Sequence, residues 1–214
     1  MATARRVGAE TSKTRDLLLD CVEKLMSEQG YAGVTYRALA AKAGVTSGLV
    51  QYYFPTLDEL FVAAIRRRSA QNLERLTGAL KASPDEPLRV LWDYSRAEST
   101  SALTTEFLAL GNHRKSIRSE IAEVTEQVRR LQLRALEATF AKKKMAIGDL
   151  SPSALLFVLT GIPKLIRLEK GVGISAAHTE VLTAFEHYVQ SATPSARRTA
   201  RPKRAATQSK KRTT

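Results

Sequence analysis

The sequence predicts an all-α protein. Apolar residues recur at intervals of three and four through most of the chain, which is the periodicity of amphipathic helices. The alternating patterns and Asn-Gly turns that mark strands and hairpins are scarce or absent. The expected architecture is an N-terminal unit of three helices followed by a larger all-helical region.

The first helix is expected to begin near Lys13, where Thr11, Ser12 or Thr14 can cap it, and to stop at Gly30. Its apolar stripe would brace the two helices that follow. The stripe comprises Leu17, Leu18, Cys21, Val22, Leu25 and Met26.

Two short helices are expected next, separated by Ala43-Gly44-Val45. Thr35 and Thr46 are each placed to cap one of them, and Gly44 supplies the backbone freedom that the turn needs. Such a pair is a helix-turn-helix, whose second helix enters the major groove of DNA and reads base edges near its N-terminus. Residues 35–53 are therefore expected to bind a specific duplex DNA site.

The rest of the chain is expected to form further helices. Thr56 and Glu59 fit a capping box that would start a long helix ending near Ser83-Pro84. The later helices are expected around residues 88–95, 103–110, 117–140, 151–171 and 175–191.

The net charge is +13, but it is unevenly distributed. Residues 191–214 contain eight basic residues and no acidic one, which leaves +5 for residues 1–190. This segment either adds sequence-independent affinity for DNA or is a solubilising extension. It also supports an alternative function, a nonspecific nucleic-acid-binding protein driven by the basic C-terminal tail.

Composition and motifs disfavour several other classes. Cys21 is the single cysteine, no apolar run reaches 18 residues, and no apolar region follows the basic N-terminus, so we expect a cytoplasmic protein that does not span a membrane. Phosphate-loop, nucleophile-elbow and zinc-protease motifs are absent, and no Cys or His residues have metal-ligand spacing. We therefore expect no catalytic residue, no metal and no cofactor, although a helical enzyme or scaffold remains a third hypothesis.

The N-terminal unit also contains a set of residues in a fixed order: Gly30, Thr35, Leu39-Ala40, Ala43-Gly44-Val45-Thr46, Phe54, Asp58 and Leu60. In order and spacing, from about Arg15 to Phe61, this set resembles the TetR family of one-component transcriptional regulators. The resemblance implies a homodimer, paired through the last two long helices, that binds a palindromic operator in double-stranded DNA. It further implies a regulator, most often a repressor, that releases the operator when a small molecule enters the C-terminal domain.

Composition, the helical pattern and the resemblance together divide the chain into four parts. Residues 1–12 are expected to be a flexible basic arm, in which Arg5 and Arg6 either touch DNA or belong to a solvated tail. Residues 13–55 would be the helix-turn-helix DNA-binding domain. Residues 56–190 would hold the connecting helix and the ligand-binding and dimerisation domain, and residues 191–214 a disordered basic tail.

The resemblance also implies the DNA contacts, with three departures from the usual pattern. Gln51 stands where Tyr is usual, and Gln can read adenine through two hydrogen bonds. Leu57 stands where Lys is usual, which leaves the helix N-terminus at Thr56 to bind that phosphate, and Tyr53 stands where His is common. The implied DNA-binding residues are Thr35, Tyr36, Arg37, Thr46, Ser47, Gly48, Leu49, Gln51, Tyr52, Tyr53 and Thr56.

Candidate residues for a small-molecule effector lie in the second half of the chain. Trp92, Phe107 and Phe157 either line a ligand cavity or are ordinary core residues. His113, at a helix junction, either contacts the ligand or is a capping or exposed histidine. A mostly apolar cavity would favour a lipophilic or aromatic effector.

Overall fold

The computed structural model describes residues 2–99, 102–143 and 150–192, and in these residues it contains helices but no strand. The predicted all-α fold class is confirmed. The N-terminal unit comprises α1 (Ala2–Gln29), a short 3₁₀ helix η1 (Tyr31–Gly33), α2 (Tyr36–Ala43) and α3 (Ser47–Tyr53). The larger region comprises α4 (Leu57–Ala82), α5 (Pro87–Ser99), α6 (Ala102–His113), α7 (Lys115–Lys143), α8 (Pro152–Gly171) and α9 (His178–Ala192).

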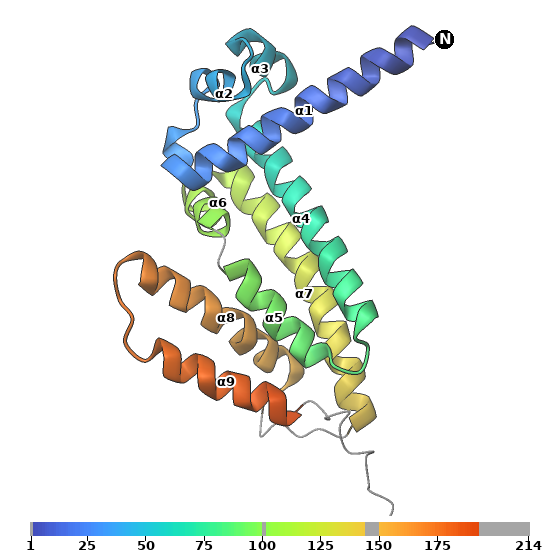
Figure 1. The fold of residues 1–214 in the computed structure, drawn as a ribbon, viewed down its shortest axis with the longest axis vertical. Helices are drawn as coiled ribbons and strands as arrows, with labels where there is room; N and C mark the ends of the chain where they lie inside the picture. The colour runs from blue at the N-terminus through green and yellow to red at the C-terminus, as the bar shows by residue number, and fades with distance from the viewer. Residues whose placement is uncertain (1, 100–101, 144–149, 193–214) are drawn as a thin grey trace, which may run out of the picture.

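Two long helices connect the ends of the molecule. α4 and α7 pack side by side, with α1, α2 and α3 at one end and the hairpin of α8 and α9 towards the other (Figure 1). α6 lies beneath α1 and packs on α7, while α5 packs between α8 and the long pair. The two ends are therefore connected mainly through α4, α6 and α7.

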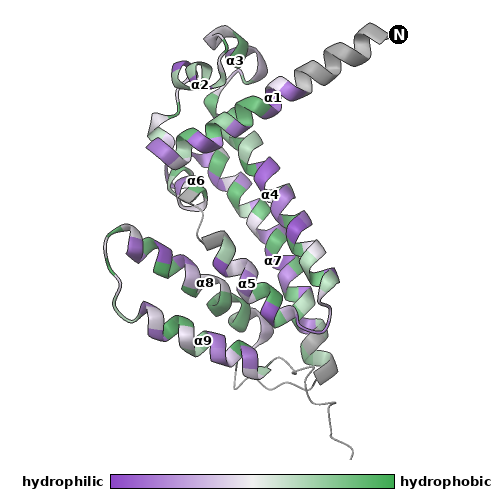
Figure 2. Cartoon of the chain, in the orientation of Figure 1, coloured by the Kyte–Doolittle hydropathy of each residue, from purple (hydrophilic) through white to green (hydrophobic). Residues whose placement is uncertain are grey.

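The apolar residues form two separate cores. Apolar and polar residues alternate along the helices in Figure 2, as amphipathic packing requires. The N-terminal core is formed by α1, α2, α3, the first half of α4, α6 and the start of α7. It includes Leu18, Leu19, Val22, Leu39, Val50, Leu60, Phe61 and Phe107. The C-terminal core joins the far end of α4 with α5, α7, α8 and α9, and it includes Leu76, Leu88, Leu91, Trp92, Leu136, Leu155, Leu159 and Val189.

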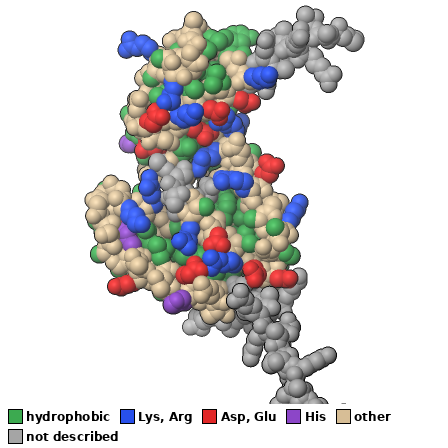
Figure 3. Space-filling model, viewed as in Figure 1, with side chains coloured by type: hydrophobic (Ala, Val, Ile, Leu, Met, Phe, Trp, Pro, Cys, Tyr) green, Lys and Arg blue, Asp and Glu red, His purple; other side chains and the backbone are tan. Residues whose placement is uncertain are grey.

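The outer surface carries mixed charges. On the face shown in Figure 3, Lys and Arg side chains are interspersed with Asp and Glu rather than gathered in one patch. This distribution agrees with the modest net charge of residues 1–190. Charge alone therefore does not locate a binding surface on this face.

The N-terminal helix differs from its prediction in two ways. It begins at Ala2, so residues 2–12 are helical where a flexible arm was expected; the segment contains several Ala, two Arg and no Pro, a composition that favours helix. Leu17, expected in the buried stripe, is exposed, and Leu19 is buried instead. The predicted basic tail lies beyond Ala192, outside the described residues.

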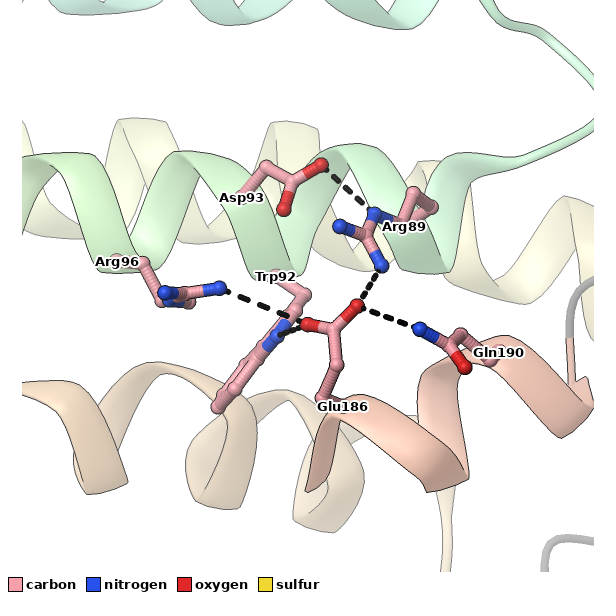
Figure 4. Close-up of polar contacts among 6 residues, drawn as sticks. All are labelled: Arg89, Trp92, Asp93, Arg96, Glu186 and Gln190. Carbon is pink, nitrogen blue, oxygen red and sulfur yellow. Dashed lines mark hydrogen bonds and ion pairs between the residues drawn. The ribbon is translucent and has the colours of Figure 1, made fainter. Parts of the chain in front are cut away.

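A polar cluster joins α5 to α9 beside the C-terminal core (Figure 4). Glu186 accepts hydrogen bonds from Trp92 Nε1 at 3.0 Å, from Gln190 at 3.1 Å and from Arg89, and Arg96 lies 3.5 Å away. The hydrogen bond from Arg89 contributes most to a pKa of Glu186 below its ordinary value. Trp92 is fully buried and stacks on Phe185, so it is a core residue rather than a ligand contact.

Candidate nucleic-acid interface

The first helix of the motif is fixed at both ends. The Ala38 N–H donates to Thr35 Oγ1 at 3.1 Å, which confirms Thr35 as the N-cap of α2. Leu39 and Ala40 are buried in the N-terminal core. Lys42 donates to Glu28 of α1 at 2.7 Å, so α2 is held on α1 by apolar packing and by an ion pair.

The turn after α2 depends on Gly44. Its φ of 69° and ψ of 31° place it in the left-handed region, and its N–H bonds to the carbonyls of Ala40 and Ala41. The Val45 N–H also donates to the Ala40 carbonyl, at 3.0 Å. A Cβ at Gly44 would meet no atom within 4 Å, so backbone conformation rather than space requires glycine.

Replacing Gly44 with Ala should lower the free energy of unfolding by about 1–2 kcal/mol, because a side chain destabilises the left-handed conformation. Gly48→Ala is the matched control. Gly48 also has open space around it but lies inside α3 without a positive φ, so Ala there should raise stability by about 0.5–1 kcal/mol. Urea unfolding of both variants measures the difference; equal effects of the two substitutions would contradict the role of the turn.

The second helix of the motif presents its outer face to solvent. Thr46 Oγ1 accepts from the Leu49 N–H at 3.3 Å and caps α3, and Val50 is buried and anchors the helix. Tyr52 is 75% exposed, with its ring edge-on to Tyr53 at 5.4 Å between centroids. The predicted DNA-binding residues that are exposed are Thr35, Arg37, Thr46, Gly48, Leu49, Gln51, Tyr52 and Thr56, while Ser47 and Tyr53 are half-buried.

The Tyr36 hydroxyl forms its hydrogen bonds within the protein. It donates toward the carbonyls of Phe54, at 3.1 Å, and Pro55, at 2.8 Å. Desolvation, and then the charge of Glu59, raise the pKa of Tyr36. Tyr36 therefore fixes α2 against the segment that joins α3 to α4, and its hydroxyl is occupied within the protein.

The N-terminus of α4 is less suited to binding a DNA phosphate than the sequence suggested. Thr56 Oγ1 accepts from the Glu59 N–H and donates to the Glu59 carboxylate, both at 3.1 Å. Asp58 accepts from Arg114 and, at 2.5 Å, from Ser116; the Ser116 bond contributes most to lowering the pKa of Asp58. Two carboxylates in the first turn disfavour an anion there, although Thr56 itself is exposed.

Two adjacent arginines of α4 connect this helix to its neighbours. Arg66 donates twice to Glu120 of α7, at 2.9 and 2.8 Å, and Arg67 donates to Glu23 of α1 at 2.7 Å. On α1, the Arg15 guanidinium lies 5.2 Å from the centre of the Phe54 ring, beside the exit of α3. Sequence reasoning missed these contacts because the partners lie about 40 residues or more apart in the chain.

A cavity of about 230 Å³ lies between α4, α5, α6, α7 and α8. Of the predicted effector contacts, Phe107 lines it. Phe157 lies outside it and is 66% exposed on α8, and His113 is exposed at the end of α6, near the ring of Tyr31. Helical periodicity alone does not show which apolar residues face a cavity, which explains these differences.

Comparison with known proteins adds to this geometry. Residues 18–64, which include the whole of α2 and α3, match the model for bacterial regulatory proteins of the tetR family. The chain is 28% identical over 169 residues to the transcriptional regulator AcrR of Shigella flexneri. This alignment covers 74% of this chain and 78% of AcrR. The segment that carries α2 and α3 is therefore of the TetR-family type. The chain is also 32% identical over 132 residues to the repressor KstR of Rhodococcus jostii, covering 58% of this chain and 60% of KstR.

The likeness of fold extends beyond the matched segment. A transcriptional regulator from Saccharomonospora viridis, solved in complex with choline, superposes with a TM-score of 0.69 at 14% identity, covering 84% of this chain and 95% of that one.

Among the helices described here, none has the length and apolar character needed to span a membrane. Within the same residues, no group of three or more His, Cys, Asp or Glu side chains is placed to hold a metal.

Proposed function

We propose that this protein is a sequence-specific DNA-binding transcriptional regulator, acting as a repressor that binds a palindromic operator as a dimer and leaves it when a small molecule binds. The observation that carries the proposal is α3, a capped helix anchored by Val50 that presents Gln51 and Tyr52 to solvent. Relatives named as regulators and repressors support it. They do not favour binding driven by the basic tail alone.

An apolar stripe on α8 supports dimerisation. Phe157, Leu165 and Leu168 of α8, and Val172 directly after its end, are all at least half exposed and follow one another at helical spacing, with Gly161 between the first two. A Cβ at Gly161 would meet no atom within 4 Å, so a second helix has room to approach. An exposed apolar stripe of this kind marks an interaction surface, and a second copy of α8 would cover it.

A link through α6 supports release by a small molecule. Thr104, Phe107 and Leu108 line the cavity from α6. Glu106, on the same helix, accepts a hydrogen bond from the Tyr31 N–H at 2.8 Å, in η1 between α1 and α2. A ligand that shifts α6 would therefore move η1 and the orientation of the helix-turn-helix. Structural neighbours solved with choline and with imidazole show that proteins of this fold hold small molecules.

The base-reading role of α3 can be tested with Gln51→Ala. We first select the preferred site from random duplex DNA and then measure affinity for that site and for unrelated DNA at one salt concentration. The variant should bind its best site about five- to 150-fold more weakly, from about 1–3 kcal/mol for one bidentate base contact, and unrelated DNA almost as before. Equal losses on both DNAs would overturn the role of Gln51.

A truncated chain ending at residue 192 is the control for the basic segment. We expect it to keep its preference for the selected site while its affinity for all DNA falls and becomes less dependent on salt. Loss of the preference on truncation would instead favour the nonspecific nucleic-acid-binding function and contradict our proposal.

A further inference from the structure

The cavity lies between the two cores, and its lining combines apolar walls with a basic, polar side. Ile65 and Phe107 belong to the N-terminal core, and Val128 packs against the C-terminal core, so the cavity lies where the two cores meet. Its apolar walls come mainly from α4, α6 and α7. They comprise Ile65, Phe107, Leu108, Ile121, Val124 and Val128.

The charged groups around the cavity are all basic. Arg68, Arg129 and Lys164 line it from α4, α7 and α8, and no Asp or Glu is among the described residues that line it. Arg129 and Lys164 are both exposed to solvent as well as lining the cavity. Desolvation, and then the nearby charge of Arg129, lower the pKa of Lys164. In the described part of the chain, neither Arg129 nor Lys164 forms an ion pair. An anion in the cavity would relieve this repulsion.

Two buried hydroxyls lining the same cavity lack partners. Ser69 Oγ and Ser95 Oγ are inaccessible to solvent and form no hydrogen bond with the described residues. Leaving a buried hydroxyl unpaired is unfavourable, and each such group needs a partner. Gln132, also buried and in the lining, adds an amide. Rotation of the two serine side chains towards the cavity would let oxygen atoms of a bound molecule accept from their hydroxyls.

We propose that the cavity binds a small organic anion, with a carboxylate or similar oxyanion near Arg129 and Lys164 and an apolar body against the walls from α4, α6 and α7. This inference rests on the proposed function, because it names the chemical class of the effector. The sequence led us to expect a lipophilic or aromatic effector. The inference adds that this effector carries an acidic group. Neutral and cationic molecules of the same shape leave the positive charges uncompensated.

Calorimetric titration of the full chain with matched probes tests the charge preference. Benzoate, benzamide and benzylamine share one ring and differ in charge, octanoate replaces the ring by a chain, and choline is a further cation. We expect benzoate or octanoate to bind at least about tenfold more tightly than the neutral and cationic probes. Tighter or equal binding of benzamide, benzylamine or choline would overturn the proposal, as would no binding of either anion at millimolar concentration.

A charge-removing pair of variants locates the binding site. Arg129→Met with Lys164→Met keeps the apolar stems and should weaken binding of the anion about tenfold or more. The control, Arg130→Met with Lys170→Met, removes the same charge from other exposed positions of the same helices, which do not line the cavity. Equal effects of the two pairs would contradict a site in this cavity.

Binding of the selected DNA site is measured on the same wild-type protein without any probe. If the protein prefers one DNA site but no anion binds, the effector class is wrong and the DNA-binding function stands. If benzoate binds but no DNA site is preferred, the cavity assignment stands and the proposed function fails. Anion binding that also weakens DNA binding would support both.

Discussion

Leu168→Glu should abolish dimerisation and weaken binding to the selected DNA site by about 100-fold or more. Leu168 is 52% exposed in the apolar stripe of α8, and a carboxylate there would be buried against a second copy without a partner. When one recognition helix of a dimer has bound its half-site, the other is held at a high effective concentration beside the second half-site. The dimer therefore binds the full site more tightly than a monomer binds one half-site. A monomer loses that gain and keeps only the affinity of one half-site.

The comparison of full and half sites isolates this effect. Wild-type protein should bind the full site far more tightly than a duplex carrying one half-site, whereas the variant should bind both almost equally. Lys170→Gln is the control, since it changes the net charge by the same amount at an exposed position two residues away, on another face of α8. Light scattering gives the oligomeric state, and a variant that stays dimeric and keeps its full-site advantage would refute pairing through α8.

Local features of this interface could be predicted from the sequence. The caps at Thr35, Thr46 and Thr56 lie within three residues of the N–H groups that they satisfy, and the structure confirms all three. Gly44 has a positive φ for the reason expected of a turn glycine. Helix types, and the approximate bounds of the helices after α1, followed from apolar periodicity, because that pattern depends on residues three and four apart. The start of α1 at Ala2 did not follow from it.

Contacts between distant segments could not be predicted in this way. Tyr36 looked available for DNA until the structure placed its hydroxyl against carbonyls 18 and 19 residues later. Glu106 reaches Tyr31 across 75 residues, and no local pattern marks that pair. The cationic side of the cavity is assembled from three helices, so Arg68, Arg129 and Lys164 are scattered in the sequence and adjacent only after folding.

Trp92→Ala should lower the free energy of unfolding by about 3–5 kcal/mol, because Trp92 is completely buried and its removal leaves a large cavity between α5 and α9. Trp92→Phe should cost less, about 1–2 kcal/mol, since a ring still stacks on Phe185 while Glu186 loses one donor and keeps Arg89. Tyr52→Ala, at an exposed position, should change stability by less than about 0.5 kcal/mol. Urea unfolding followed by circular dichroism, at one protein concentration, measures all three. Equal costs for the Ala and Phe variants at residue 92 would show that packing of the indole contributes little, and the C-terminal core would then depend on the Glu186 hydrogen bonds.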